Sequence, residues 1–185
     1  MINTETALFA ALSRRKTNDI IYIVYSAIVE SLLLAGSSKK IPLTPVPVTL
    51  QTMVLLVMSM FLGWRAAGSA SALYLLEGAV GLPVFANGSG LIYLFGPTGG
   101  YLFGFFVSSL VVGYLSELNW GKSIILTFTS LTIGTIIIYC FGIFWLSYWK
   151  DMTTAITFGL LPFLTPDLLK ICLGSCLVAA GSEIK

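Results

Sequence analysis

Long apolar runs alternate with short polar, glycine-rich and proline-rich interruptions along the chain after residue 19. A helix needs about 20 apolar residues to cross a bilayer, because each residue adds about 1.5 Å to its length. The runs predict six helices, at about residues 20–36, 50–62, 66–80, 101–115, 123–146 and 167–180. The second and third are short for spanning segments, and the turn at Gly63, Trp64 and Arg65 joins them as a hairpin. The pattern predicts an all-α integral membrane protein, a six-transmembrane-helix bundle.

Three of the interruptions have unusual compositions. Three prolines fall within residues 42–47, glycine and proline recur through residues 81–100, and a third loop covers residues 150–166. Proline lacks an amide proton and glycine loses much backbone entropy in a helix, so these stretches favour irregular backbone. Irregular backbone near a membrane must be covered by protein or must line a wet cavity. We therefore expect the 81–100 loop to form the wall of a pocket.

The composition supports a membrane location. The 185 residues are 57% hydrophobic and only 10% charged, whereas a soluble domain carries about 25% charged residues. These values predict a single membrane domain over residues 20–185, preceded by a cytoplasmic N-terminal segment over residues 1–19, and no cleavable signal peptide is evident. The net charge of +2, without a basic cluster interleaved with aromatic residues, argues against a nucleic-acid partner.

The basic residues predict the orientation in the membrane. With the N-terminus inside, six basic residues fall on the cytoplasmic side and three on the outer side, which the positive-inside rule favours. The inner set is Arg14, Arg15, Lys16, Arg65, Lys122 and Lys185, and the outer set is Lys39, Lys40 and Lys150. We therefore expect both termini in the cytoplasm and the three irregular loops together on the outer face.

Several kinds of chemistry are excluded or disfavoured. Histidine is absent, which removes His-based triads and His-ligated metal sites. Cys140, Cys172 and Cys176 lie in apolar segments without further ligands nearby, so we interpret them as small buried fillers and predict no metal site. Gly121, Lys122 and Ser123 match only the end of a nucleotide-binding P-loop, and Ser116 stands where its first glycine is required.

Asp167 and Lys170 form the sharpest pair of polar residues. They lie three positions apart and therefore share a helix face near the outer end of the last segment. Ionisable groups inside a membrane domain usually face the bundle interior or a water-filled cavity. A binding role and a neutralising ion pair at the interface explain this pair equally well from chemistry alone.

Four further polar residues have structural explanations beside a functional one. Asn87 offers an amide donor and acceptor in the 81–100 loop, although Asn-Gly is also a common turn pair. Gln51 stands at the head of a membrane helix, where capping explains it nearly as well as binding. Glu77 lies one turn before the same loop and can approach its cavity, whereas Glu30 lies deeper in the first helix; structural hydrogen bonding is the default for both.

Small residues recur every four positions in the first helix, at Ala27, Ser31 and Ala35. This spacing lets another helix approach closely and commonly marks helix association. Packing inside the bundle and docking of a partner helix explain the stripe equally well.

Three sequence blocks and the Asp167–Lys170 pair resemble the BioY family, the biotin-specific substrate-binding (S) components of energy-coupling-factor (ECF) transporters. The blocks are residues 45–52 (PVPVTLQT), 81–86 (GLPVFA) and 96–101 (GPTGGY). The resemblance implies a six-helix S-component with the vitamin site on the outer side, in the bacterial cytoplasmic membrane. It also implies uptake driven by a transmembrane coupling subunit and two ATPase subunits, with Ala27, Ser31 and Ala35 as the docking stripe.

The resemblance further implies that Asp167, Lys170 and Asn87 contact the ligand. A Lys ammonium suits the valerate carboxylate of biotin, and Asp and Asn groups suit its ureido ring. Its thiophane ring and alkyl chain need apolar walls, for which Phe85, Tyr93, Phe95 and Tyr101 are available. No cofactor is implied, since biotin is the transported ligand. Leu102 departs from the family pattern, because some members carry arginine immediately after this tyrosine.

Two alternatives remain at this point. The first keeps the S-component and changes the ligand to a related carboxylate such as dethiobiotin. The second is a polytopic membrane enzyme that uses Glu30, Glu77 and Asp167 as acid–base groups, since paired carboxylates catalyse proton transfer when their pKa values separate.

Overall fold

Helices make up most of the protein in the computed structural model, which describes residues 20–38, 40–41, 48–86 and 88–183. Each of the six predicted segments contains a helix, and the first has the predicted bounds. These helices are α2 (Ile20–Gly36), α3 (Gln51–Leu62), α4 (Trp64–Ala79), α6 (Gly99–Glu117), α7 (Ile124–Trp149) and α9 (Leu161–Glu183). The short elements are β1 (Lys40–Ile41), β2 (Val48–Thr49), α5 (Leu91–Leu94), the 3-10 helix η1 (Trp120–Lys122) and α8 (Met152–Gly159).

Three helical stretches within the described residues are long and apolar enough to cross a membrane: Gly99–Glu117, Ile124–Trp149 and Met152–Ser182. The helices α2 and α3 are apolar but shorter, with 17 and 12 residues. A 12-residue helix is about 18 Å long, well below the hydrocarbon thickness of about 30 Å. The three longer stretches are those expected of a multi-pass membrane protein.

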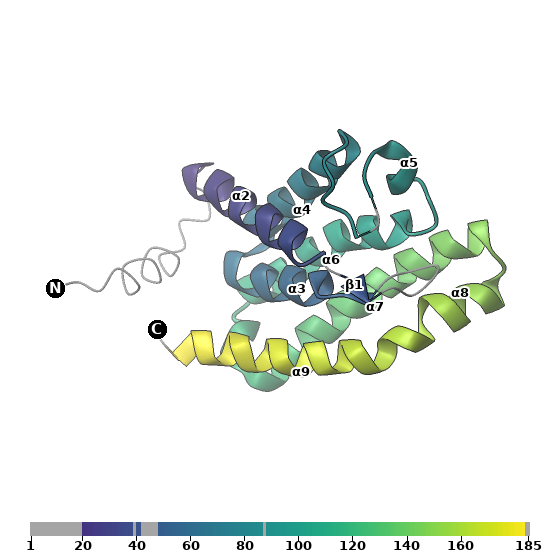
Figure 1. The fold of residues 1–185 in the computed structure, drawn as a ribbon. Helices are drawn as coiled ribbons and strands as arrows, with labels where there is room; N and C mark the ends of the chain where they lie inside the picture. The colour runs from purple at the N-terminus through teal and green to yellow at the C-terminus, as the bar shows by residue number, and fades with distance from the viewer. Residues whose placement is uncertain (1–19, 39, 42–47, 87, 184–185) are drawn as a thin grey trace.

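The helices pack around α3 and α6. The first helix, α2, lies mainly against α4, while α6 packs against α3, α4 and α7, and α9 packs against α3 and α7 (Figure 1). Glycine permits the close contact of α6 with α7: a Cβ at Gly100 would lie 2.5 Å from the backbone oxygen of Phe141, and one at Gly104 would lie 2.9 Å from the Cα of Ile138. Small residues at helix contacts are typical of membrane bundles.

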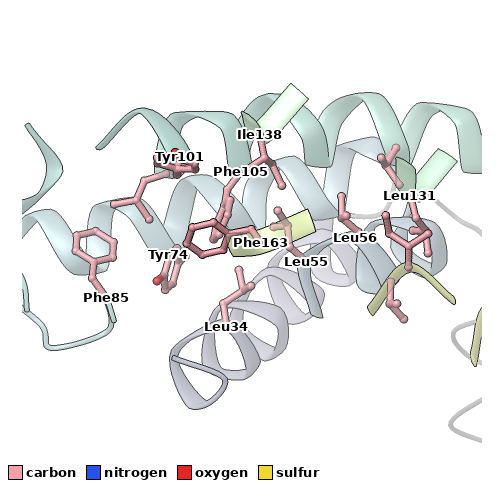
Figure 2. Packing of buried hydrophobic residues seen from close by; sticks show 14 of the residues in the cluster. Leu34, Leu55, Leu56, Tyr74, Phe85, Tyr101, Phe105, Leu131, Ile138 and Phe163 are labelled. Atoms are coloured by element: carbon pink, nitrogen blue, oxygen red, sulfur yellow. The ribbon is translucent and has the colours of Figure 1, made fainter. Parts of the chain in front are cut away.

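The apolar core lies where these helices converge. Figure 2 shows side chains of α2, α3, α4, α6, α7 and α9 pointing toward one another, and Leu34, Leu55, Tyr74, Leu131 and Ile138 among them are 2% exposed or less. Hydrogen-bonded serines are interleaved with this core, for example Ser71 and Ser109, whose hydroxyl oxygens are 2.7 Å apart. Because buried serines lie beside buried apolar residues, hydrophobicity alone does not identify the buried face of a helix.

The region between α7 and α9 is more helical than the sequence analysis predicts. Residues 151–166 were expected to form a loop, but α8 occupies part of it and α9 begins at Leu161, not near Asp167. Asp151 caps α8, because its carboxylate accepts hydrogen bonds from the Thr154 amide at 2.8 Å and hydroxyl at 2.7 Å. These bonds lower the pKa of Asp151 below its usual value. Pro162 lies in the first turn of α9, where the missing amide proton costs nothing.

The cysteine prediction is wrong. Cys140, Cys172 and Cys176 are exposed on the protein surface and do not fill the core. They belong to the apolar outer faces of α7 and α9, where hydrophobicity reflects contact with lipid and not burial in protein.

Candidate ligand-binding site

A cavity of ≈ 70 Å³ lies between the N-terminal halves of α3, α6 and α9 and the C-terminal half of α7. It is lined by five of the residues predicted from the sequence: Gln51, Tyr93, Tyr101, Asp167 and Lys170. Its remaining lining residues are Thr49, Thr52, Ala86, Thr98, Leu102, Phe105, Ile138, Tyr139 and Phe163. Most of the wall is therefore apolar, with a few polar groups gathered on the α3 and α9 sides, as is typical of small-molecule sites.

The Asp167–Lys170 pair forms the charged part of this wall. The Lys170 Nζ lies 2.7 Å from the Asp167 Oδ1, and the two side chains are only 11% and 7% exposed. The same Nζ donates to the Thr52 hydroxyl at 3.3 Å, while the Tyr139 hydroxyl donates to the Asp167 Oδ2 at 2.5 Å. Helices α3, α7 and α9 thus hold one continuous chain of polar contacts, in which both carboxylate oxygens are bonded.

Gln51 lines the cavity, but its amide group is engaged by the protein. Its Nε2 donates to the Leu34 carbonyl at 3.1 Å and to the Tyr74 hydroxyl at 2.5 Å, and its Oε1 accepts from the Thr49 hydroxyl at 3.2 Å. The Tyr74 hydroxyl in turn donates to the Val84 carbonyl at 3.2 Å. Gln51 therefore connects α2 and α4 and, through Tyr74, the 81–90 segment, a structural role that differs from the helix capping weighed for it.

Tyr101 and Leu102 lie on the α6 wall of the cavity. The Tyr101 hydroxyl donates to the Gly159 carbonyl at 2.8 Å, which fixes the ring across the ends of α7 and α8. Both residues are buried, so the leucine that replaces the arginine of some family members faces an apolar environment and adds no charge to the site. Lys170 is the cation that the described part of the chain presents to the cavity.

The glycine- and proline-rich segment supplies part of the cavity wall, as predicted. Ala86 and Tyr93 line the cavity, while Phe85 lies behind Tyr93, with their rings stacked at 5.3 Å. Besides the bond from Tyr74, the Gly90 amide donates to the Gly78 carbonyl at 2.6 Å, and the Trp145 indole donates to the Gly96 carbonyl at 2.9 Å. Asn87 lies outside the described residues, and its predicted contact stays a prediction.

Phe85, Phe95 and Glu77 do not line this cavity. Phe85 is buried against Tyr74 and Tyr93, and Phe95 is exposed. The Glu77 carboxylate accepts a hydrogen bond from the Ser31 hydroxyl at 3.2 Å, so it faces α2 instead of the ligand cavity. Their contact with a ligand stays a prediction, and for Glu77 the hydrogen bond to Ser31 is the structural role that the sequence analysis takes as its default.

The small-residue stripe of α2 lies within the bundle. Ala27 and Ser31 are buried, Ser31 contacts α4 through Glu77, and Ala35 is half-buried. In this arrangement α4 occupies the close approach beside the stripe, as the bundle-packing alternative expects, and docking of a partner helix on it stays a prediction. Glu30 is fully buried on the same helix, and its carboxylate oxygens have no hydrogen-bond partner among the described residues.

Two polar residues of the site were not selected as site residues from the sequence. Thr52 stands at the head of a membrane helix, where capping explains a polar residue nearly as well as binding, yet it receives a hydrogen bond from Lys170. Tyr139 stands in the longest apolar run, where a tyrosine resembles any other lipid-facing aromatic residue. Neither could be assigned without knowing which faces of α3 and α7 meet α9.

The fold and the site together define a multi-pass membrane protein with a largely apolar cavity that carries one buried ion pair. A family model described as the BioY family matches residues 6–184. The biotin transporter BioY of Thermotoga maritima is 40% identical over 151 residues, which cover 80% of this chain and 88% of that protein. The chain belongs to the BioY family.

More distant comparisons agree. The probable biotin transporter BioY of Pyrococcus horikoshii is 32% identical over 145 residues, covering 78% of this chain and 85% of that protein. The crystal structure of the S-component for biotin from an ECF-type ABC transporter superposes with a TM-score of 0.76, covering 91% of this chain and 94% of that one, at 24% identity. At this level of identity the likeness shows the fold, which is that of an S-component.

Proposed function

We propose that this protein binds biotin with high affinity and takes it up across the cytoplasmic membrane as the substrate-specific subunit of an ECF transporter. The observation that carries the proposal is the buried Asp167–Lys170 pair in the wall of a mostly apolar cavity. Family membership supports it, since the relatives are named as biotin transporters.

The charged pair must separate when biotin enters, because the carboxylate and the ureido ring lie at opposite ends of the ligand. The Lys170 ammonium binds the valerate carboxylate, and Asp167 accepts hydrogen bonds from the ureido N–H groups. Tyr93, Tyr101 and Phe163 supply walls for the thiophane ring and the alkyl chain. Without a ligand, the charges of Lys170 and Asp167 neutralise each other. A ligand that breaks this contact must replace it for both groups, so it should offer an anion to the lysine and N–H donors to the aspartate.

The cavity must enlarge to admit a vitamin. Its volume of ≈ 70 Å³ is far below the about 300–1,000 Å³ of typical ligand pockets. The 81–96 segment is the wall best able to move, because it has little regular secondary structure and its hydrogen bonds to the bundle are made through backbone groups at Val84, Gly90 and Gly96. Entry from the outer side through this segment leaves the helix contacts intact.

The proposal includes the arrangement in the cell. Residues 20–185 form one membrane domain that crosses the bacterial cytoplasmic membrane six times, with residues 1–19 and the C-terminus in the cytoplasm. The short helices α2, α3 and α4 cross where the bilayer thins locally around them. A transmembrane coupling subunit and two ATPase subunits supply the energy for uptake. The protein uses no cofactor, metal or nucleic acid, and biotin is its ligand.

The enzyme alternative has little support. Among the described residues, Asp167 is the one carboxylate that lines the cavity, while Glu77 bonds to Ser31 and Glu30 is enclosed in α2 packing. The three groups considered as an acid–base set are therefore not brought together. A related ligand such as dethiobiotin remains a second candidate, because it carries the same carboxylate and ureido groups.

Isothermal titration of the purified protein with biotin and with dethiobiotin tests the proposal. We expect sub-micromolar binding of biotin and weaker binding of dethiobiotin, which fills less of the apolar wall. Uptake of labelled biotin by cells should require co-expression of the coupling and ATPase subunits. Absence of sub-micromolar biotin binding by folded protein would contradict the proposal.

A further inference from the structure

A second, larger hollow lies on the other side of the site wall. It is a groove of ≈ 790 Å³ between α7, α8 and α9, lined among others by Phe128, Ile136, Phe144, Leu164 and Leu168. We propose that this groove binds an acyl chain of a membrane lipid and that Tyr139 is the partition between the lipid and the ligand cavity. The proposal rests on the membrane location and ligand cavity of the proposed function.

The groove offers an occupant almost no hydrogen bonds. The Thr132 hydroxyl donates to the Phe128 carbonyl at 2.8 Å, and the Thr135 hydroxyl donates to the Leu131 carbonyl at 2.9 Å. The Tyr139 hydroxyl is bonded to Asp167, whose other oxygen is bonded to Lys170. Each of these oxygen groups is therefore satisfied within the protein, and what faces the groove is hydrocarbon. An apolar chain fits such a surface, whereas a polar ligand would lose its hydration without replacement.

The source of the chain follows from the position of the groove. Its walls are α7 and the α8–α9 stretch, the two longest stretches able to cross a membrane. A hollow between them opens toward the bilayer interior, where lipid acyl chains are the abundant apolar molecules. An empty apolar groove would forfeit dispersion contacts on both helices, so we expect it to retain a chain more firmly than the flat helix faces around it.

Tyr139 connects this groove to the biotin site. Tyr139 and Asp167 line both hollows, so one aromatic ring and its hydroxyl bond separate lipid from ligand. The intact ring keeps acyl chains out of the cavity, and the hydroxyl keeps the Asp167 carboxylate turned away from the lipid. Removal of the ring should let a hydrocarbon chain enter the cavity and compete with biotin.

Photo-crosslinking in lipid tests the groove itself. The protein is reconstituted with a phosphatidylcholine that carries a diazirine in one acyl chain, then extracted into detergent and irradiated, so that only firmly bound lipid reacts. We expect adducts at Ile136 and Leu164 and none at Ile125 or Leu173, which are at least as exposed but lie outside the groove. Adducts spread evenly over these sites, or no adducts, would overturn the proposal. The readout needs no biotin, so it stands if the proposed function fails.

A matched pair of variants sharpens this test. Thr132→Trp fills the groove, whereas Thr129→Trp lies one turn away on the same helix with the same kind of hydroxyl bond, to Ile125 at 2.8 Å. We expect loss of the groove adducts in Thr132→Trp and full retention in Thr129→Trp. Equal labelling of both variants would overturn the proposal. Loss of labelling in wild-type protein when the coupling subunit is bound would show a protein interface instead, and would also overturn it.

Biotin titrations in detergents of different alkyl-chain length test the partition. For wild-type protein and for Tyr139→Phe, we expect biotin affinity to be independent of the chain length, because the ring remains in both. For Tyr139→Ala, affinity should fall as detergent concentration and chain length rise, as competition requires. If the biotin affinity of Tyr139→Ala does not depend on the alkyl-chain length of the detergent, the role of Tyr139 as a partition is overturned.

Discussion

Removal of the Lys170 ammonium should separate the binding role of the ion pair from its structural role. Lys170→Met keeps the length and apolar volume of the side chain but deletes the charge that lies 2.7 Å from Asp167. Because both side chains are nearly buried, solvent screens the pair only slightly. The Asp167 carboxylate would retain a single side-chain donor, the Tyr139 hydroxyl. Loss of one partner of a buried pair costs about 3–5 kcal/mol of folding stability.

The effect on the ligand should differ between biotin and its amide. A hydrogen bond to a charged group contributes about 1.5–3 kcal/mol, which corresponds to an increase in Kd of about 10- to 150-fold for biotin. Biotin amide carries no carboxylate, so it loses much less. The unpaired Asp167 would also repel the biotin anion, which acts in the same direction.

The double variant Asp167→Asn, Lys170→Met gives the control within the pair. With both charges gone, no buried charge is left unpaired, and we expect most of the lost stability to return. The preference for biotin over its amide should nevertheless remain lost. Lys122→Met, which removes an exposed lysine at the end of η1, should change neither quantity.

Calorimetric titration and thermal unfolding in one detergent measure both quantities. Equal weakening of biotin and biotin amide by Lys170→Met would show that the ammonium does not bind the carboxylate. An unchanged unfolding temperature in Lys170→Met would show that the pair contributes nothing to the fold, contrary to the burial argument.

Three further predictions concern packing, a buried hydroxyl and a helix cap. Gly100→Ala should destabilise the protein by about 1–3 kcal/mol, because the new Cβ would lie 2.5 Å from a backbone oxygen of α7, whereas Gly36→Ala, with nothing within 4 Å, should be neutral in thermal unfolding. Tyr101→Phe should cost about 0.5–1.5 kcal/mol, since a carbonyl at the end of α8 loses its donor; an unchanged unfolding temperature would refute this. Folding lowers the pKa of Asp151, so its cap stabilises α8 above the ordinary carboxyl pKa, and this stability is lost as the pH falls through the lowered pKa. Hydrogen exchange of the Thr154 amide should accelerate in that acidic range. In Asp151→Asn, the exchange rate should change with pH only as the intrinsic rate does.

The helices themselves were largely predictable, because an uninterrupted apolar run in a membrane must form a helix to satisfy its own backbone. This holds for α2, whose bounds match, and for the uncharged run that becomes α7. The start of α9 was not predictable from Pro162 and Pro166, since proline is tolerated in a first helical turn and a single missing bond deeper in the helix is compensated by packing.

The site was predictable only in part. Asp167 and Lys170 could be selected because charges are rare and costly in an apolar helix, and their spacing of three places them on one face whatever the bundle looks like. Thr52 and Tyr139 depend on where α3 and α7 meet α9. The hydrogen bond expected for Glu77 is confirmed, but its partner Ser31 could not be named from the sequence, since the contact depends on the packing of α2 against α4.

The sequence by itself determined the membrane location, the helical runs, the irregular cavity wall and the charged pair of the cavity, because each of these follows from local composition or spacing. Tertiary structure alone decided which side of every helix faces protein. In a bilayer the lipid is as apolar as the core, so hydrophobicity does not distinguish the buried Ala27 from the exposed Cys140. Packing makes that distinction, and it places Tyr139 at the boundary between the two environments.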